Sequence, residues 1–183
     1  TINYTNATIT SKNPFWNPST SKVDFKYYET QTGIKPDVVQ IYLGTNDYGK
    51  LDSVVVANIK VLIDAILRDW NIPIMVVLVP FRANQDGIGL QEGNLRIDIK
   101  NRLTVFNQHK AYIDAFDNYN DKVKLVHVGA THDSEFNYGV VQKQVNPRNT
   151  FTTPQPLESV HPQEPGYLQM ADIMWGTLLD VIK

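Results

Sequence analysis

The sequence predicts an α/β fold built around a parallel sheet, because three apolar runs of strand length alternate with longer segments of helical periodicity. The expected strands are residues 38–43, 74–79 and 123–128. Between them, apolar residues recur every three or four positions, which is typical of helices packed on a sheet. Strands and helices that alternate in this way form βαβ units with right-handed crossovers.

The expected helices begin and end at recognisable residues. A short helix starts at Asp24, runs through Tyr28 and stops near Gly33. The next covers residues 52–70, where Asp52 or Ser53 can cap the N-terminus, and its apolar positions are Val55, Ile59, Leu62, Ile63 and Ile66. A third opens at Asn94, with an apolar face made of Leu95, Ile99, Leu103, Phe106, Tyr112, Ile113 and Phe116. A closing helix covers residues 164–182, with Tyr167, Met170, Ile173, Met174 and Leu178 on one side.

The segments between these elements are polar or rich in glycine. Residues 1–22 contain many Thr, Ser and Asn residues and two Asn-Pro pairs, which favours turns. Residues 81–93 carry three glycines and are expected to form a loop, and residues 129–157 form a long polar connection. No internal repeat is visible, so we expect one domain over residues 1–183.

Composition excludes several classes of function. The formal net charge is −2 and no basic stripe is present, so nucleic acid is not an expected partner. The absence of Cys excludes disulfides and zinc-thiolate sites. No apolar run is long enough to span a bilayer, and the chain opens on Thr1 rather than on a leader, although a processed or truncated start remains open. The sequence does not determine the compartment, and we favour a secreted protein.

Two short blocks carry the chemistry. Gly44-Thr45-Asn46-Asp47 directly follows the first strand, and Glu158-Ser159-Val160-His161-Pro162 precedes the last helix. Ligands of parallel sheets bind at the carboxyl ends of the strands, so residues of the first block can face a substrate. The second block comes from the connection after the third strand.

These residue types suit acyl transfer. A neutral His with a carboxylate on its other ring nitrogen is a good general base, which assigns His161 as base and Glu158 as its acid. An Asn amide can donate to an oxyanion, which assigns Asn46 to that role. Gly44 and Asp47 shape the loop, and Asp47 is expected to cap it or the next helix. Structural alternatives stay open: a turn-capping Asn46, a surface His161 and a solvated Glu158.

Together the two blocks resemble the third and fifth sequence blocks of the SGNH hydrolases, the GDSL esterase and lipase family. Residues 13–18 and the following Val23-Asp24-Phe25 also resemble a segment of that family. The resemblance implies a three-layer, flavodoxin-like α/β/α sandwich with strand order 2-1-3-4-5. The three expected strands would be its third, fourth and fifth, and the first two are absent from this chain. The family carries its nucleophilic Ser in a Gly-Asp-Ser block, which does not occur here.

The resemblance therefore implies a serine ester hydrolase that acts on a small ester or an acylated glycan, without a cofactor. Asn46 would be the oxyanion donor, His161 the base, and Glu158 would stand where the family carries Asp. The nucleophile would come from residues outside this chain, and the chain alone would be inactive. A further segment or a second chain would then complete the sheet. The alternative is a degenerate, non-catalytic domain of the same fold that binds a carbohydrate or another partner.

Other residues are weaker candidates. Phe15 and Trp16 can line an acyl or sugar pocket, with apolar packing as the alternative. Arg148 can contact a substrate, with a structural role as the alternative. His127 lies within an expected strand, where a satisfied core or strand His is the expectation. His127, His132 and Asp133 could hold a metal, but their spacing fits no ligand pattern, so no metal is predicted.

Overall fold

The computed structural model of the chain describes residues 13–45, 47, 50–81, 95–133, 137–144, 146–156 and 161–182. Its central feature is a three-stranded parallel sheet made of β3 (Val39–Ile41), β4 (Ile74–Val77) and β5 (Val123–Val126). The strand order is β3-β4-β5, and the register pairs Val39 with Ile74 and Ile74 with Val123. The predicted α/β fold with a parallel sheet is confirmed, although each strand is shorter than predicted.

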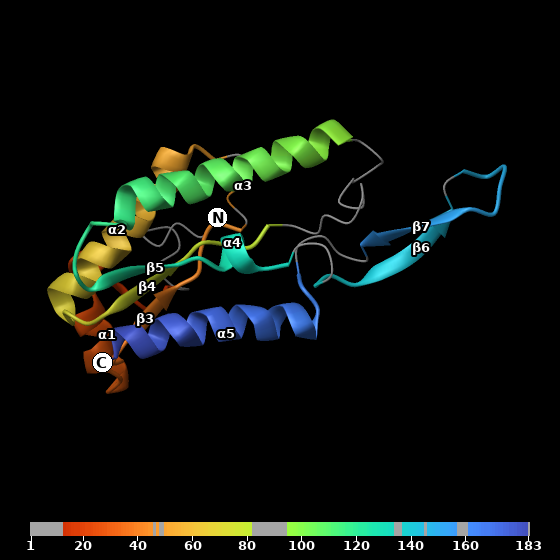
Figure 1. Ribbon diagram of the computed structural model, residues 1–183. Helices are drawn as coiled ribbons and strands as arrows, with labels where there is room; N and C mark the ends of the chain where they lie inside the picture. The colour runs from red at the N-terminus through yellow and green to blue at the C-terminus, as the bar shows by residue number, and fades with distance from the viewer. Residues whose placement is uncertain are drawn as a thin grey trace.

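Helices cover both faces of this sheet (Figure 1), with α3 (Leu95–Phe116) on one side and α5 (Glu164–Val181) on the other. The helix α2 (Asp52–Asp69) packs on the same face as α3. Successive side chains of a strand point to opposite faces, so β4 supplies both cores. Ile74 and Val76 belong to the α2 side, and Met75 and Val77 to the α5 side.

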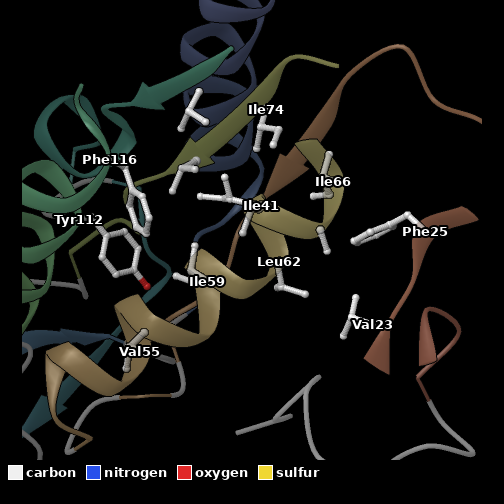
Figure 2. Close-up of a cluster of buried hydrophobic side chains, with 14 of the residues drawn as sticks. Val23, Phe25, Ile41, Val55, Ile59, Leu62, Ile66, Ile74, Tyr112 and Phe116 are labelled. Carbon is white, nitrogen blue, oxygen red and sulfur yellow. The ribbon is translucent and has the colours of Figure 1, made fainter. Parts of the chain in front are cut away.

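The larger core forms between α2, α3 and the sheet (Figure 2), and it contains the buried apolar stripe of α2. All five apolar positions predicted for this helix are buried: Val55, Ile59, Leu62, Ile63 and Ile66. The predicted cap is wrong, because the N-cap is Leu51, which makes no side-chain hydrogen bond. Asp52 instead lies in the first turn, where its negative charge interacts favourably with the helix dipole.

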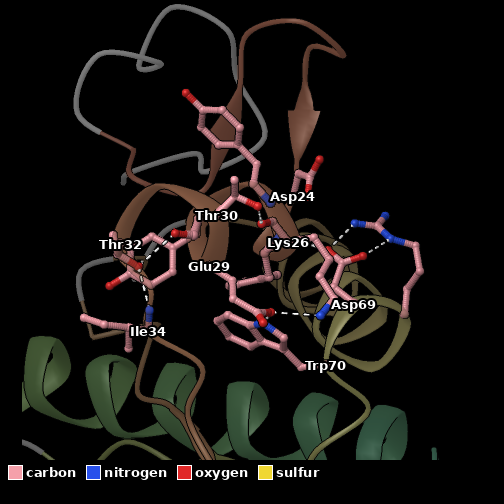
Figure 3. Close-up of polar contacts among 12 residues, drawn as sticks. Asp24, Lys26, Glu29, Thr30, Thr32, Ile34, Asp69 and Trp70 are labelled. Carbon is pink, nitrogen blue, oxygen red and sulfur yellow. Dashed lines mark hydrogen bonds and ion pairs between the residues drawn. The ribbon is translucent and has the colours of Figure 1, made fainter.

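The helix α1 (Phe25–Thr32) begins and ends as the sequence predicts. The Asp24 carboxylate caps it by accepting a hydrogen bond from the Tyr27 backbone N–H at 2.8 Å. Gly33 ends it in the left-handed region, with φ of 71°. Figure 3 shows how polar contacts tie α1 to the end of α2: the Trp70 indole donates to Glu29 at 2.9 Å.

Three features of the fold were not predicted. A small hairpin joins β1 (Trp16–Asn17) and β2 (Lys22–Val23), and a longer one joins β6 (Val140–Gln144) and β7 (Thr152–Pro156) within the polar connection. A short helix α4 (Val128–Thr131) follows β5 directly. The third strand therefore ends at Val126, and the predicted core or strand His127 is wrong, because this residue is exposed at the start of α4.

The predicted buried face of α3 is partly wrong. Among the described side chains, Leu103, Phe106 and Ile113 are exposed, whereas Tyr112 and Phe116 are buried as predicted. The face that meets the sheet also includes three further buried residues, Val105, Gln108 and His109. The prediction was based on the spacing of apolar residues alone. Polar side chains on this face are also buried, because they bind carbonyls at the strand ends. On α5, Tyr167 is likewise exposed, while Met170, Ile173, Met174 and Leu178 pack on the sheet.

Within the described ranges, no helix combines the length and the apolar character that crossing a membrane would need.

Candidate functional site

Three of the predicted site residues that the structure describes belong to segments at the carboxyl ends of the strands: Gly44, Asp47 and His161. Gly44 and Asp47 follow β3. His161 precedes α5, and the chain next to it is tied to the segment after β4. The Gln163 N–H donates to the Asn137 carbonyl at 2.7 Å, and the neighbouring Tyr138 hydroxyl donates to the Phe81 carbonyl at 2.8 Å. Asn46 and Glu158 lie outside the described residues.

The turn after β3 is held from behind by α3. The Gln108 side-chain amide donates to the Gly44 carbonyl at 3.2 Å, and the Tyr112 hydroxyl donates to the Leu43 carbonyl at 3.1 Å. The Asp47 N–H donates to the same Gly44 carbonyl at 2.9 Å and closes the turn. Gly44 has φ of 117°, which an L side chain rarely adopts. A Cβ at Gly44 would also lie 2.6 Å from the Tyr112 hydroxyl oxygen, so this close approach requires glycine.

Two acceptor atoms at this turn are buried. Asp47 Oδ1 and Gln108 Oε1 have no hydrogen-bond partner within the described part of the chain. A buried acceptor without a partner costs about 1–3 kcal/mol, so such atoms mark a position where a donor would be bound favourably. Neither atom can stabilise a developing oxyanion, because carboxylate and amide oxygens are acceptors. A hydrogen-bond donor to an oxyanion would have to be another group of this turn.

His109 fastens α3 to the end of β4. Its Nε2 lies 2.6 Å from the Val79 carbonyl oxygen, and the side chain is buried. Burial lowers the pKa of His109, the bond to Val79 counteracts this, and the charge of nearby His127 lowers it further. A neutral ring that donates to a carbonyl carries its proton on Nε2, which leaves Nδ1 as an acceptor. His109 is thus a donor fixed to the backbone, which is a structural task.

His132 lies beyond α4 and faces Tyr138, with ring centroids 5.7 Å apart. It is buried, and neither ring nitrogen has a hydrogen-bond partner within the described part of the chain. Burial lowers the pKa of His132, against an opposing effect of the Asp133 charge. The described residues contain no group of three His, Cys, Asp or Glu side chains that could hold a metal ion. The alternative in which His127, His132 and Asp133 bind a metal therefore has no support in the described structure.

His161 is exposed at the start of α5, and the chain around it is firmly anchored. Pro162 is buried against Gly166, where a Cβ would lie 2.6 Å from the proline ring. The side-chain oxygen of Gln169 accepts from the Asp133 N–H at 2.8 Å and from the Asn137 amide at 2.5 Å. These contacts fix the position of the helix start, and with it the backbone of His161.

The N-terminal aromatic candidates, Phe15 and Trp16, both make packing contacts. Phe15 contacts Phe25 and Tyr28 with ring centroids 4.7 and 4.9 Å apart, and Trp16 is buried. Trp16 also borders two shallow grooves of about 420 and 440 Å³, but neither groove includes Gly44, Asp47 or His161. Apolar packing accounts for the described contacts of both residues, and a role in lining a substrate pocket stays a prediction.

Arg148 lies at the tip of the β6–β7 hairpin, which projects from the body at the same end as the start of α5 (Figure 1). The tip is organised by side chains that bind the backbone. The Arg148 N–H donates to Asn146 at 2.8 Å, and the Phe151 N–H donates to Asn149 at 3.1 Å. Arg148 is exposed, and its contact with a substrate stays a prediction.

The sequence did not single out Gln108, His109 or Tyr112 as a polar set, although Gln108 and His109 lie four and three positions before Tyr112, which puts them on its face of α3. The sequence signal for this set was two polar residues and a tyrosine on one face of a helix that packs against strand ends. It could not be separated from ordinary surface polarity without knowing which face was buried.

Comparisons with known proteins identify the fold alone. No family model matches the chain, and no curated protein matches it. One similar solved structure is that of a protein from Streptococcus pneumonia, which is provisionally described as a platelet activating factor. The TM-score is 0.57 at 17% sequence identity, and the match covers 78% of this chain. The chain spans only 59% of that structure.

Proposed function

We propose that these residues form part of a serine ester hydrolase of the SGNH type, with a flavodoxin-like sandwich, that removes small acyl groups from glycan or similar esters. The observation that carries the proposal is the shared position of the two blocks. The Gly44–Asp47 turn follows β3, and His161 opens α5, next to the segment that follows β4. Both therefore lie where parallel sheets bind ligands. The likeness to a solved structure, with a TM-score of 0.57, supports the fold.

In the proposed reaction, His161 takes the proton from a serine hydroxyl as its oxygen attacks the acyl carbon. The carbonyl oxygen becomes negative and accepts a hydrogen bond from the Asn46 amide. When the tetrahedral intermediate collapses, the proton passes from His161 to the leaving alcohol. Water, deprotonated by His161, then attacks the acyl-enzyme in the same way. The carboxylic acid product leaves, and His161 returns the proton to the serine. Glu158 would orient the His161 ring and stabilise its cationic form.

The described residues on either side of Asn46 are held by hydrogen bonds, as a catalytic donor between them would need. Gln108 and Tyr112 donate to the carbonyls of Gly44 and Leu43. Both donors belong to α3, which is itself packed on the sheet. A preorganised oxyanion donor typically contributes about 10²- to 10³-fold in rate, and it does so only if it is held in place before the reaction. This arrangement favours Asn46 as a catalytic donor over Asn46 as a simple turn residue.

The nucleophile would come from residues outside these 183. The sequence contains six serines, at positions 11, 19, 21, 53, 134 and 159, and none follows Gly-Asp. Of the described ones, Ser19 and Ser21 lie in the β1–β2 turn, and Ser53 is exposed in the first turn of α2. None of these three has a described hydrogen bond to a histidine.

Labelling with a fluorophosphonate probe tests the proposal. The 183-residue chain should not be labelled and should hydrolyse p-nitrophenyl acetate no faster than a denatured control. The product of the complete reading frame should label at a serine outside these residues, and His161→Ala in it should abolish labelling. Labelling of any of the six serines would contradict the assignment. So would an unlabelled complete product, which would instead favour the second candidate, a non-catalytic domain that binds a carbohydrate.

A further inference from the structure

One of the two grooves beside Trp16 lies between α1 and the segment of residues 13–18, and we call it the Trp16 groove. Its volume is about 440 Å³, and its lining includes three aromatic side chains, Trp16, Tyr27 and Tyr28. None of the lining residues is Asp, Glu, Lys, Arg or His. The helix α1 leads into the start of β3, so the groove lies at the opposite end of the sheet from the proposed catalytic site (Figure 1).

Several polar groups of the lining residues have no partner within the described part of the chain. The Trp16 indole N–H and the hydroxyls of Tyr27 and Tyr28 make no hydrogen bond to a described residue. The side-chain amide of Gln31, which is exposed in the last turn of α1, makes none either. Tyrosine hydroxyls and the Gln amide donate and accept, whereas the indole only donates. The groove therefore offers both kinds of hydrogen-bonding group to a ligand.

The floor of the groove is held in place by packing. Tyr28 contacts Phe15 and Trp70 with ring centroids 4.9 and 6.4 Å apart. Trp16 is buried, and its backbone N–H donates to the Asn13 carbonyl at 3.1 Å. A ligand that binds here would not have to order these side chains, which lowers the entropic cost of binding.

Tyr27 differs from these aromatic residues because it takes no part in packing. Its side chain is half-buried, belongs to neither hydrophobic core and contacts no other described aromatic ring. Its backbone N–H, not its side chain, donates to the Asp24 cap. Gln31 lies four positions later, so the two side chains are neighbours on the surface of α1. The fold thus places an aromatic face beside a free amide without using either one.

We propose that the Trp16 groove binds a neutral oligosaccharide. The negative face of the Tyr27 ring attracts the C–H groups of a sugar ring, and the sugar hydroxyls bond to the Gln31 amide and the Trp16 indole. The lack of charged lining residues favours a neutral sugar over an acidic one, which would need a cation beside it. This site goes beyond the proposed esterase, because sugar binding here requires neither the serine nor His161.

A proline-rich peptide is the competing ligand, because such peptides also bind grooves lined by aromatic residues. Proline has no backbone N–H, so this kind of peptide presents mainly carbonyl acceptors. It would leave the Gln31 amide oxygen without a donor from the ligand, whereas every sugar hydroxyl both donates and accepts. The mixture of donors and acceptors in the groove therefore favours the sugar.

NMR titration of the product of the complete reading frame tests the proposal, and the signals it measures do not depend on esterase activity. The probes are ester-free hexasaccharides of N-acetylglucosamine, glucose and xylose. At least one of them should shift the indole N–H signal of Trp16, with a Kd of about 1 mM or tighter. The indole signal of Trp175, which is exposed on α5, should stay in place.

Variants of the groove show whether binding occurs there. Tyr27→Ala and Gln31→Ala should each weaken binding by about 3- to 10-fold, as expected for the loss of one stacking or hydrogen-bonding partner. Both variants should fold, because neither side chain belongs to a core. Tyr167→Ala is the matched control, because it removes an exposed tyrosine from α5 and should leave the Kd unchanged.

The proposal is overturned if no hexasaccharide shifts the Trp16 signal, or if Tyr27→Ala and Gln31→Ala bind as tightly as the unaltered protein. It is also overturned if a proline decapeptide shifts this signal at lower concentrations than every hexasaccharide does. If a hexasaccharide binds and no serine is labelled by the fluorophosphonate, the groove stands and the proposed function fails. Labelling without sugar binding has the opposite meaning.

Discussion

The imidazole of His109 donates to the carbonyl of Val79, and this contact exists only because position 129 has no side chain. Gly129 lies so close that an added Cβ would be 2.1 Å from His109 Cε1 and 2.6 Å from the Val79 oxygen. One helix, one strand end and the start of α4 therefore meet at a point with no spare volume. This junction lies at the edge of the sheet where we place the site.

Gly129→Ala should destabilise the protein by about 1–3 kcal/mol or more, because the new methyl group displaces a buried ring and a backbone carbonyl. Gly176→Ala is the matched control. No atom lies within 4 Å of a Cβ at that helical position, so this substitution should stabilise by roughly 0.5–1 kcal/mol. Urea denaturation of both variants measures the difference, and equal midpoints would contradict the tight junction.

Acid should weaken the fold through two buried histidines. Burial lowers the pKa of both His109 and His132 from 6.5, so the unfolded chain binds protons at pH values where the folded chain does not. Stability is then complete above about pH 6.5 and falls as the pH drops below it, by at most about 1.4 kcal/mol per pH unit for each histidine. Urea unfolding at a series of pH values between about 5 and 8 should show this slope.

His132→Leu should flatten that slope and raise stability at neutral pH by about 1 kcal/mol, since apolar atoms replace two buried ring nitrogens that have no partner among the described residues. His127→Gln serves as the control, because His127 is exposed and its loss should leave the stability of the fold nearly unchanged. An unaltered pH slope in His132→Leu would show that this side chain is solvated in solution.

Asp24→Ala should cost about 1 kcal/mol or more, because Asp24 caps α1 and also accepts from the Asn17 amide at 2.8 Å. Burial alone would raise the pKa of Asp24, but the hydrogen bonds of Asn17 and Tyr27 and the charge of Arg68 lower it. Its contribution is therefore present at neutral pH and is lost as the pH falls through the range below 3.8. Asp37→Ala, at an exposed position, should change thermal stability little.

The pairing of Glu158 with His161 remains a prediction, and kinetics on the complete product can test it. His161→Ala should abolish turnover, whereas Glu158→Ala should cost less, because a loop carbonyl can partly replace the acid. Glu158→Asp should keep or raise kcat, since Asp is the family residue. If Glu158→Ala leaves the pH-rate profile unchanged, Glu158 is a loop charge and the base acts without an acid.

The sheet and most helices could be predicted because their apolar residues recur with a clear period and their ends carry clear signals. Asp24 and Gly33 bound α1, and the buried positions of α2 were all correct. The buried face of α3 was predicted poorly because Gln108 and His109 are buried by hydrogen bonding to strand-end carbonyls, which periodicity does not detect.

The β6–β7 hairpin was missed for a different reason. Its stability depends on register and on Asx turns at Asn146 and Asn149, while its composition reads as a polar loop. For the site, the sequence could indicate residue types and the end of the sheet. The distance between Asn46, Glu158 and His161 could not be predicted, because it depends on loops whose conformation no local pattern specifies.

The β6–β7 hairpin also determines where the chain can tolerate insertions and deletions. Val140 pairs with Pro156 at its base, so the residues between them leave and return to the body at neighbouring points. To the α/β body this stretch is equivalent to a short connection, and its length adds little to the entropy of closing the chain between β5 and α5. The tip can therefore be lengthened, trimmed or exchanged without altering the order in which the body assembles. New ligand contacts could arise there at little cost to the stability of the sheet.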